Sequence, residues 1–197
     1  MKKTALLILA AGASRRMGSC KQLLPWKNTT LIGNAIETAL ASKADEVFVV
    51  LGANFDTINN TIKHYPINIL RNLQWEKGMG TSIAYGLTAI QDHKNNFTSV
   101  LISLADLPLV DAIHYNLLID KSNSSKNNII ASSYEEKIGV PAIFNKKYFA
   151  KLISLNKDVG AAKLIKQHIN DVSQLKIEVK HKDIDTVEDY KDLKSKL

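Results

Sequence analysis

Residues 4–18 read TALLILAAGASRRMG, so an apolar run passes directly into a loop of small and basic residues. A continuous apolar run that ends at such a loop is typical of a strand buried on both faces of a parallel sheet. Ligands of parallel α/β sheets bind beyond the carboxyl ends of the strands. The loop that follows residue 9 is therefore expected to border a binding site.

The same stretch also has the features of a secretory signal, because Lys2 and Lys3 precede the apolar run and small residues follow it. The run is at the lower limit of length for a signal, and two arginines come almost directly after it. The rest of the chain has the alternating pattern of a cytoplasmic α/β enzyme. We therefore expect a strand here and a cytoplasmic protein.

Five further apolar runs predict strands at residues 47–51, 67–70, 99–104, 128–132 and 142–144. Between them, apolar residues recur with helical spacing. These are Leu31, Ala35, Ile36 and Leu40 in one segment, Ile83, Leu87 and Ile90 in a second, and Ile113, Leu117 and Leu118 in a third. Strands that alternate with helices pair in parallel, with helices on both faces of the sheet. The sequence thus predicts a single domain over residues 1–197 with a three-layer, doubly wound, Rossmann-like α/β fold and a mostly parallel sheet.

The composition argues against several classes of protein. Of the 197 residues, 45% are hydrophobic and 23% charged, which is too apolar for a disordered chain. No apolar run approaches the roughly 18 residues that a membrane-spanning helix needs, and a single cysteine, Cys20, cannot form a disulfide scaffold. Lys and Arg number 26 against 19 Asp and Glu, giving +7, but only three are Arg and no basic block occurs. We expect neither a membrane nor a nucleic acid as a partner.

The loop after the first strand carries Gly12, Arg15, Arg16 and Lys21 among small residues. Small side chains let backbone N–H groups wrap around an anion, while Arg binds two oxygens at once and Lys supplies a point charge. Five residues separate Gly12 from Gly18 with no Lys directly after, so this is not a Walker loop, and the dinucleotide-binding spacing is absent too. On these residues alone, a phosphate-binding loop and a solvated surface loop are equal alternatives.

Residues 9–21 resemble the loop LAAGxSxRMGxxK of nucleotidyltransferases that activate a phosphorylated acceptor with an NTP. The continuation KQLLPW, residues 21–26, is most similar to the molybdenum cofactor cytidylyltransferase branch of the molybdopterin-guanine dinucleotide synthase-like family. The resemblance extends over residues 7–190. It implies a fold of the nucleotide-diphospho-sugar transferase type, an Mg²⁺ ion that Mn²⁺ can replace, CTP and molybdopterin as substrates, and a molybdoenzyme as downstream partner.

A second nucleotide-contacting segment is expected in NLQWEKGMGTS, residues 72–82. Its two glycines precede a helix and let a base or ribose approach the backbone, although Thr81 or Ser82 can equally serve as a helix cap. By the resemblance, the nucleotide-binding residues are Leu9, Ala10, Ala11, Gly12, Ala13, Ser14, Arg15, Lys21, Gly80, Thr81, Ser82 and Asp106.

Two aspartates are expected to hold the metal. Asp106 follows the strand at residues 99–104, where a carboxylate can bind Mg²⁺ together with water and substrate phosphates; its alternative role is that of a turn residue. In DIDTVED, residues 183–189, the resemblance assigns the second ligand to Asp185, with Asp183 as the alternative. Thr186 and Asp189 have the spacing of a helix cap, which accounts for Asp189.

The acceptor pocket is assigned by resemblance alone, through the segments EKIGVPAIF, residues 136–144, and DVGAAK, residues 158–163. The residues concerned are Gly139, Pro141, Gly160 and Lys163. Two positions depart from the family: Val140 replaces the common His or Asn, and Ala162 replaces the usual Arg. Lys163 is not equivalent to Arg for recognising a phosphate through two hydrogen bonds.

The expected reaction is nucleotidyl transfer with release of pyrophosphate, with Arg15, Lys21 and Asp106 as the catalytic residues. A phosphate acceptor that arrives as a dianion needs no general base. Three alternatives stay open: GTP in place of CTP, a sugar phosphate in place of molybdopterin, and a non-catalytic protein that binds the nucleotide or the cofactor. The five histidines lack metal-ligand spacing, so zinc is not expected.

Overall fold

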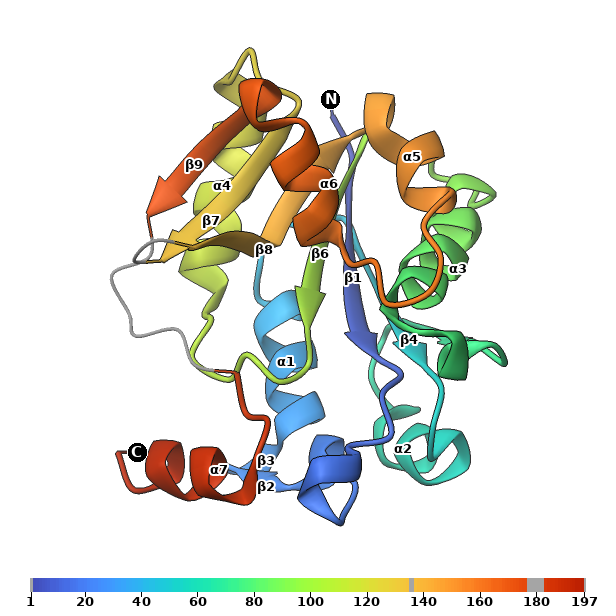
Figure 1. The fold of residues 1–197 in the computed structure, drawn as a ribbon, viewed down its shortest axis with the longest axis vertical. Helices are drawn as coiled ribbons and strands as arrows, with labels where there is room; N and C mark the ends of the chain where they lie inside the picture. The colour runs from blue at the N-terminus through green and yellow to red at the C-terminus, as the bar shows by residue number, and fades with distance from the viewer. Residues whose placement is uncertain (1, 135–136, 177–182, 197) are drawn as a thin grey trace.

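The structure is a computed structural model that describes residues 2–134, 137–176 and 183–196, and its main sheet has seven strands in the order β5-β4-β1-β6-β8-β7-β9 (Figure 1). The strands are β1 (Thr4–Ala10), β4 (Glu46–Leu51), β5 (Asn68–Arg71), β6 (Ser99–Leu104), β7 (Ile129–Tyr134), β8 (Lys137–Asn145) and β9 (Val172–Lys176). β1 lies inside the sheet and pairs in parallel with β4 and β6. A separate two-stranded ribbon joins β2 (Pro25–Trp26) to β3 (Thr29–Thr30).

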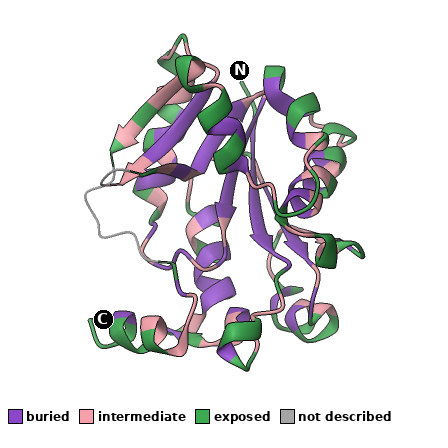
Figure 2. Cartoon of the chain, in the orientation of Figure 1, coloured by how far each residue is buried: buried purple, intermediate pink, exposed green. Residues whose placement is uncertain are grey.

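Helices cover both faces of the main sheet. One face packs against α1 (Leu31–Leu40), α2 (Phe55–Ile62) and α4 (Ala112–Ser124), and the other against α3 (Met79–Gln91), α5 (Phe149–Ile153) and α6 (Ala161–Gln167). Successive residues of β1 point to opposite faces, so Leu7 packs on the α3 side and Leu6 on the α1 side. Both are fully buried, as the sheet is along most of its length (Figure 2). The predicted three-layer, mostly parallel α/β fold is confirmed.

The sheet departs from a fully parallel arrangement at β8, which runs antiparallel to both β6 and β7. This strand is longer than the predicted run at residues 142–144, because it begins at Lys137 and includes the GVP segment. β9 was not predicted. Its sequence, VSQLK, holds only two apolar residues, as suits a strand that lies at the edge of the sheet and pairs with β7 alone.

The prediction of which α4 residues face the core is partly wrong. Ile113 and Leu117 are 68% and 49% exposed, whereas His114 and Tyr115 are buried beside Leu118. The polar atoms of the two buried rings find partners in the sheet, since His114 Nε2 lies 2.7 Å from Ser132 Oγ and Tyr115 OH lies 2.8 Å from Ser103 Oγ. Satisfied hydrogen bonds allow these amphipathic side chains to replace the aliphatic residues that the helical spacing favoured.

The C-terminal helix α7 (Val187–Lys194) packs on a small cluster of its own, apart from the two faces of the sheet. Met17 and Trp26 of the N-terminal loop meet Ile184 and Leu193 there. Tyr190 OH donates a hydrogen bond of 2.6 Å to Pro25 O. The last described segment is thus fastened to the loop after β1, although the two are far apart in the sequence. Across the described residues, the helices are too short or too polar to cross a bilayer.

Candidate active site

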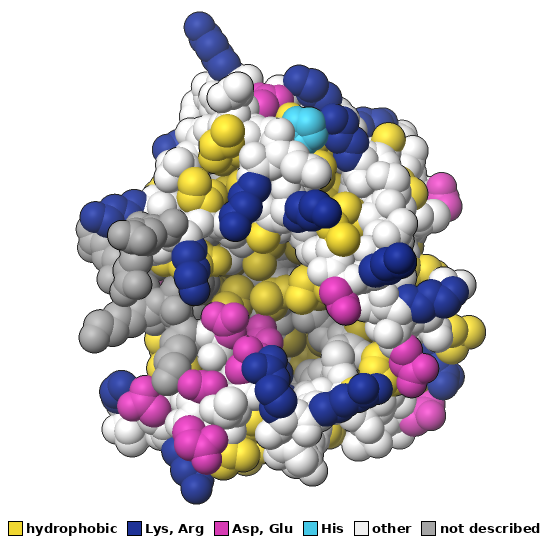
Figure 3. All heavy atoms as spheres, in the orientation of Figure 1, with side chains coloured by type: hydrophobic (Ala, Val, Ile, Leu, Met, Phe, Trp, Pro, Cys, Tyr) yellow, Lys and Arg dark blue, Asp and Glu magenta, His cyan; other side chains and the backbone are white. Residues whose placement is uncertain are grey.

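A cavity of about 560 Å³ opens where β1 and β6 end. Its walls come from the loop after β1, the start of α3, the turn after β6, Asp158 and Asp185. Figure 3 shows a hollow in this face of the molecule with apolar side chains on its floor and charged side chains around its rim. The size and the mixed lining are those of a small-molecule site, at the end of the sheet where parallel α/β folds bind ligands.

The loop after β1 presents backbone donors. All of residues 9–16 line the cavity, and residues 11–14 belong to no helix or strand. In the described part of the chain, the backbone N–H groups of residues 11–14 donate to no other group. Consecutive free N–H groups on a concave loop form an anion-binding surface. Ser14 adopts left-handed backbone geometry, with φ of 54°, where the loop turns into the short 3₁₀ helix Arg15–Met17.

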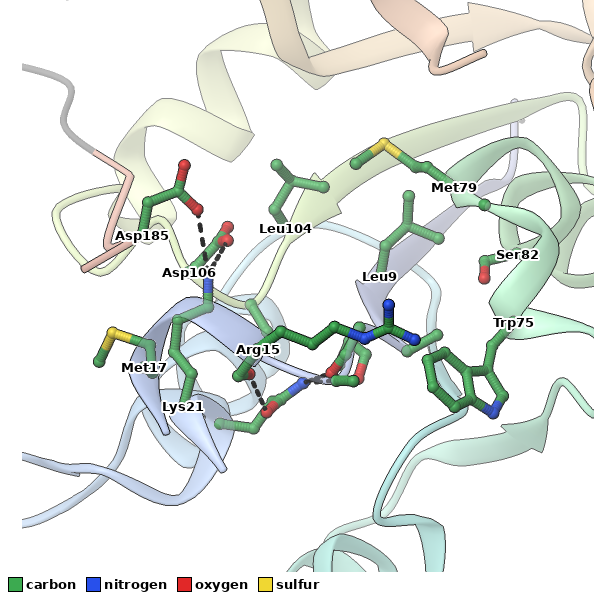
Figure 4. Close-up of a pocket in the computed structure, with 18 of the residues that line it drawn as sticks. Leu9, Arg15, Met17, Lys21, Trp75, Met79, Ser82, Leu104, Asp106 and Asp185 are labelled. Carbon is green, nitrogen blue, oxygen red and sulfur yellow. Dashed lines mark hydrogen bonds and ion pairs between the residues drawn. The ribbon is translucent and has the colours of Figure 1, made fainter. Parts of the chain in front are cut away.

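Opposite these donors, Lys21 brings two carboxylates together (Figure 4). Its Nζ lies 2.6 Å from Asp106 Oδ2 and 3.6 Å from Asp185 Oδ1, and it donates a third bond of 2.6 Å to Ile184 O. The guanidinium of Arg16 lies 3.1 Å from Asp185 Oδ2. Two carboxylates from segments about 80 residues apart in the sequence therefore face one point beside the loop, and a cation occupies that point.

Asp106 is unusual among these groups because its second oxygen is unsatisfied. Oδ1 is buried, and no described residue donates a hydrogen bond to it. Burial raises the pKa of this carboxyl; Lys21 opposes the shift, while Asp183 and Asp185 add to it. A buried carboxylate oxygen with no partner is costly to keep in a protein unless a ligand completes it.

A divalent cation fits this arrangement. The donors are hard carboxylate oxygens, one of them orphaned, and the Lys21 ammonium already lies between them. Within residues 2–134, 137–176 and 183–196, no group of three or more His, Cys, Asp or Glu gathers to enclose a metal. The site therefore suits an ion that takes few protein ligands and completes its shell with water and phosphate, as Mg²⁺ does.

The C-terminal segment owes its position to local hydrogen bonds. Thr186 caps α7 by accepting from the Asp189 N–H at 3.1 Å, and the Asp189 carboxylate accepts from the Thr186 N–H at 2.9 Å. The predicted cap is confirmed. Ile184, fully buried, donates its N–H to Asp106 O at 3.2 Å. Asp185 is thus held beside Asp106 by its neighbours on both sides. Asp183 is exposed and lies outside the cavity lining.

The opposite wall belongs to the short 3₁₀ helix Trp75–Lys77 and the start of α3. Trp75, Met79 and Ser82 line the cavity there (Figure 4). Gly80 and Thr81, expected as nucleotide contacts, do not line it. A side chain at Gly80 would collide with the Asn156 backbone, and Thr81 Oγ1 donates to Gly78 O at 2.8 Å. The close packing of the Asn156 loop accounts for this glycine.

The residues expected to bind the acceptor also lie outside the cavity lining. Gly139 and Pro141 are buried in β8, and a side chain at Gly139 would meet the Tyr134 hydroxyl. Gly160 packs against Met79 at the start of α6, and Lys163 is exposed on that helix. Among the described residues of the segments assigned to the acceptor, Asp158 alone reaches the cavity. Their acceptor role stays a prediction.

Several lining residues were not among the predicted site residues, notably Arg16, Gln22, Trp75 and Asp158. A signal for Arg16 was present, because the arginine of the LAAGxSxRMGxxK pattern falls on residue 16 rather than 15. Arg15 extends across the cavity toward Trp75 (Figure 4). Arg16 instead pairs with Asp185. Both arginines are therefore within the site.

Residues 6–172 match the family model described as the MobA-like NTP transferase domain. The chain belongs to this family. It is accordingly an enzyme of the nucleotidyltransferase type, as the loop and the fold predicted.

Several proteins are similar to this chain over most of its length. Nicotine blue oxidoreductase of Paenarthrobacter nicotinovorans is 30% identical, with 92% of each chain covered. The purine catabolism protein PucB of Bacillus subtilis (strain 168) is 29% identical, covering 93% of this chain and 92% of its own. The crystal structure of Rv0371c from Mycobacterium tuberculosis H37Rv superposes with a TM-score of 0.87 at 26% identity, over 98% of each chain. A second structure of that protein, a complex with manganese, gives 0.84 at 23% identity over the whole of both chains.

Proposed function

We propose that this enzyme transfers a cytidylyl group from CTP to the phosphate of molybdopterin, with Mg²⁺ as the metal and pyrophosphate as the second product. The observation that carries the proposal is the pair Asp106 and Asp185 on one ammonium, next to a loop whose N–H groups at residues 11–14 donate to none of the described residues. These parts match the needs of phosphoryl chemistry, which are positioning and charge neutralisation rather than covalent help from the protein. The manganese complex of Rv0371c supports a divalent ion.

In this reaction an oxygen of the acceptor phosphate attacks the α-phosphorus of CTP. The bond between that phosphorus and the oxygen bridging to the β-phosphate breaks, and pyrophosphate leaves with the electron pair. The loop N–H groups of residues 11–14 bind the β- and γ-phosphates and stabilise the charge that develops there. Arg15, Arg16 and Lys21, which line the same cavity, would add three cations around these phosphates.

Asp106 and Asp185 would hold the metal ion, and the Lys21 ammonium beside them would be available to the phosphates. When bound, the ion neutralises phosphate charge and aligns the nucleophile with the leaving group. The chain's own contribution is to keep the two carboxylates in place, through the Ile184 and Asp189 hydrogen bonds described above. The product would pass to a molybdoenzyme in the cytoplasm.

The test is an assay for pyrophosphate with purified enzyme, each of the four NTPs, Mg²⁺ or Mn²⁺, and either molybdopterin or a sugar phosphate. We expect product with CTP and molybdopterin. Turnover with GTP instead reassigns the base, and turnover with a sugar phosphate reassigns the acceptor. Binding of every NTP without turnover on any acceptor contradicts the catalytic proposal and favours a binding protein.

A further inference from the structure

Gln22 is a buried amide beside the site whose hydrogen-bonding capacity is fully used. It lies in the 3₁₀ helix Lys21–Leu23 and is 4% exposed. Its Nε2 donates to Ala10 O at 3.0 Å and to Gly12 O at 2.8 Å. Its Oε1 accepts from Ser14 Oγ at 3.1 Å and from Cys20 Sγ at 3.3 Å. One side chain therefore holds the loop at three positions, residues 10, 12 and 14.

These bonds fix the direction of two peptide planes. In a trans peptide the carbonyl of one residue and the N–H of the next point in opposite directions. Because the carbonyls of Ala10 and Gly12 point at the Gln22 amide, the N–H groups of Ala11 and Ala13 point away from it. These are two of the N–H groups that donate to no described residue, and both residues line the cavity.

The described residues make two other backbone hydrogen bonds to this loop. They run from Ala53 N to Ala11 O, at 3.0 Å, and from Met17 N to Ser14 O, at 2.9 Å. Neither bond sets the planes that contain the Ala11 and Ala13 N–H groups. A side chain at Gly12 would meet nothing within 4 Å, so steric crowding at the glycine does not set them either. The Gln22 amide is the group positioned to do so.

We propose that Gln22 is a positioning residue that holds the Ala10 and Gly12 carbonyls so that the Ala11 and Ala13 N–H groups face the triphosphate. The inference rests on the proposed function, in that the ligand of the loop is taken to be the triphosphate. Gln22 does not act on the substrate itself; it acts through the loop backbone. Its loss should therefore weaken binding of a polyphosphate anion more than it weakens the fold.

The test compares Gln22→Met with wild type for binding of inorganic tripolyphosphate, measured by calorimetry. Methionine keeps the length of the side chain, removes both donors and adds no charge. Because two hydrogen bonds to the loop carbonyls are lost, we expect an affinity about ten- to thirtyfold lower. Asn68→Leu is the matched control, because the Asn68 amide also donates to two acceptors, Glu46 Oε2 and Val47 O, at the opposite end of the sheet. It should lower the melting temperature and leave the tripolyphosphate affinity within about twofold, since additive sites this distant rarely couple.

A second measurement needs no variant. In the wild-type protein, added tripolyphosphate should shift the amide proton signals of Ala11 and Ala13 downfield while the Gln22 side-chain NH₂ signals stay in place. The inference is overturned if those two amides do not respond, if wild type does not bind tripolyphosphate, or if Gln22→Met and Asn68→Leu change the affinity equally. A wild type that binds tripolyphosphate with this dependence on Gln22 and yet transfers no nucleotide refutes the proposed function alone.

Discussion

Asp106 and Asp171 lie at opposite ends of the same sheet, and they differ in the number of hydrogen-bond donors around each carboxylate. Asp171 accepts hydrogen bonds from the Asn128 backbone and amide, from Lys147 Nζ at 3.1 Å and from Tyr148 OH at 2.9 Å. Asp106 accepts from Lys21 alone among the described side chains, and its Oδ1 is orphaned. Both oxygens of Asp171 thus accept hydrogen bonds, whereas one oxygen of Asp106 accepts none from the described residues.

The pKa values follow the same division. Donated hydrogen bonds outweigh partial burial at Asp171 and hold the pKa of its carboxyl well below the usual range. At Asp106 burial prevails over its single ammonium partner and raises the pKa. Asp171, surrounded by donors, is expected to stabilise the fold. Asp106, with one unpaired buried oxygen, is expected to cost stability until a ligand binds. Four variants and conditions test this contrast.

The largest effect is expected from Asp106→Asn. The substitution removes a metal ligand, so nucleotidyl transfer should fall by about a thousandfold or more. It also removes a carboxylate that burial disfavours, and Lys21 keeps Asp185 and Ile184 O as partners, so the melting temperature should change little. Parallel pyrophosphate assays and thermal melts check both. A clear loss of stability would mean that Asp106 is structural, like Asp171.

Lys21→Met should lower turnover by about a hundredfold, because one cation that stabilises the phosphates is lost. It also leaves Asp106 buried without an ammonium, which destabilises the metal-free protein. Added Mg²⁺ should restore part of the lost melting temperature. Thermal melts with and without Mg²⁺ measure this; a stability loss that Mg²⁺ leaves unchanged, with turnover preserved, would contradict a role in the site.

Asp171→Asn should lower the free energy of unfolding by about 2 kcal/mol, because it leaves donors on Asn128, Lys147 and Tyr148 without a charged acceptor. The kcat of the folded enzyme should stay within about twofold of wild type, since distant sites are nearly independent. Urea unfolding and steady-state kinetics provide the two numbers. Loss of turnover at unchanged stability would mean that Asp171 serves catalysis rather than the fold.

The smallest effect concerns acid stability. Because the folded pKa of Asp171 is depressed, its contribution is present above the unfolded value of about 4 and is lost as the pH falls through the folded value. Wild type should therefore lose stability progressively below about pH 4. Asp171→Asn should show a shallower decline over the same range in urea unfolding at several pH values. Equal slopes for the two proteins would mean that Asp171 does not contribute to the loss of stability in acid.

The sequence predicts most of the fold because the central strands are continuous apolar runs. β1, β4 and β6 need burial on both faces, which leaves few alternatives for their placement. The local sequence does not predict the antiparallel direction of β8, because strands of either direction have the same apolar pattern. It does not predict β9 either, because an edge strand with few apolar residues resembles a loop. The inner face of α4 was misassigned because hydroxyl partners in the sheet, Ser103 and Ser132, allow a buried Tyr and His.

The candidate site is partly legible in the sequence. Asp106 and the loop after β1 follow strands directly, so the position of parallel strand ends predicts where they lie. The approach of Asp185 and the amide bonds of Gln22 depend on tertiary packing and have no signal in local spacing. At Gly80, the close approach of the Asn156 backbone is a packing reason for glycine that the local sequence does not reveal, and its contact with the nucleotide stays a prediction.

The most direct measurement is a crystal structure with Mn²⁺ and CTP, in which anomalous scattering locates the metal. We expect one Mn²⁺ ion bound by both Asp106 and Asp185, with the triphosphate on the N–H groups of residues 11–14 and Lys21 moved from the carboxylates to the phosphates. An ion bound away from either aspartate, or a triphosphate that avoids the loop, would contradict it.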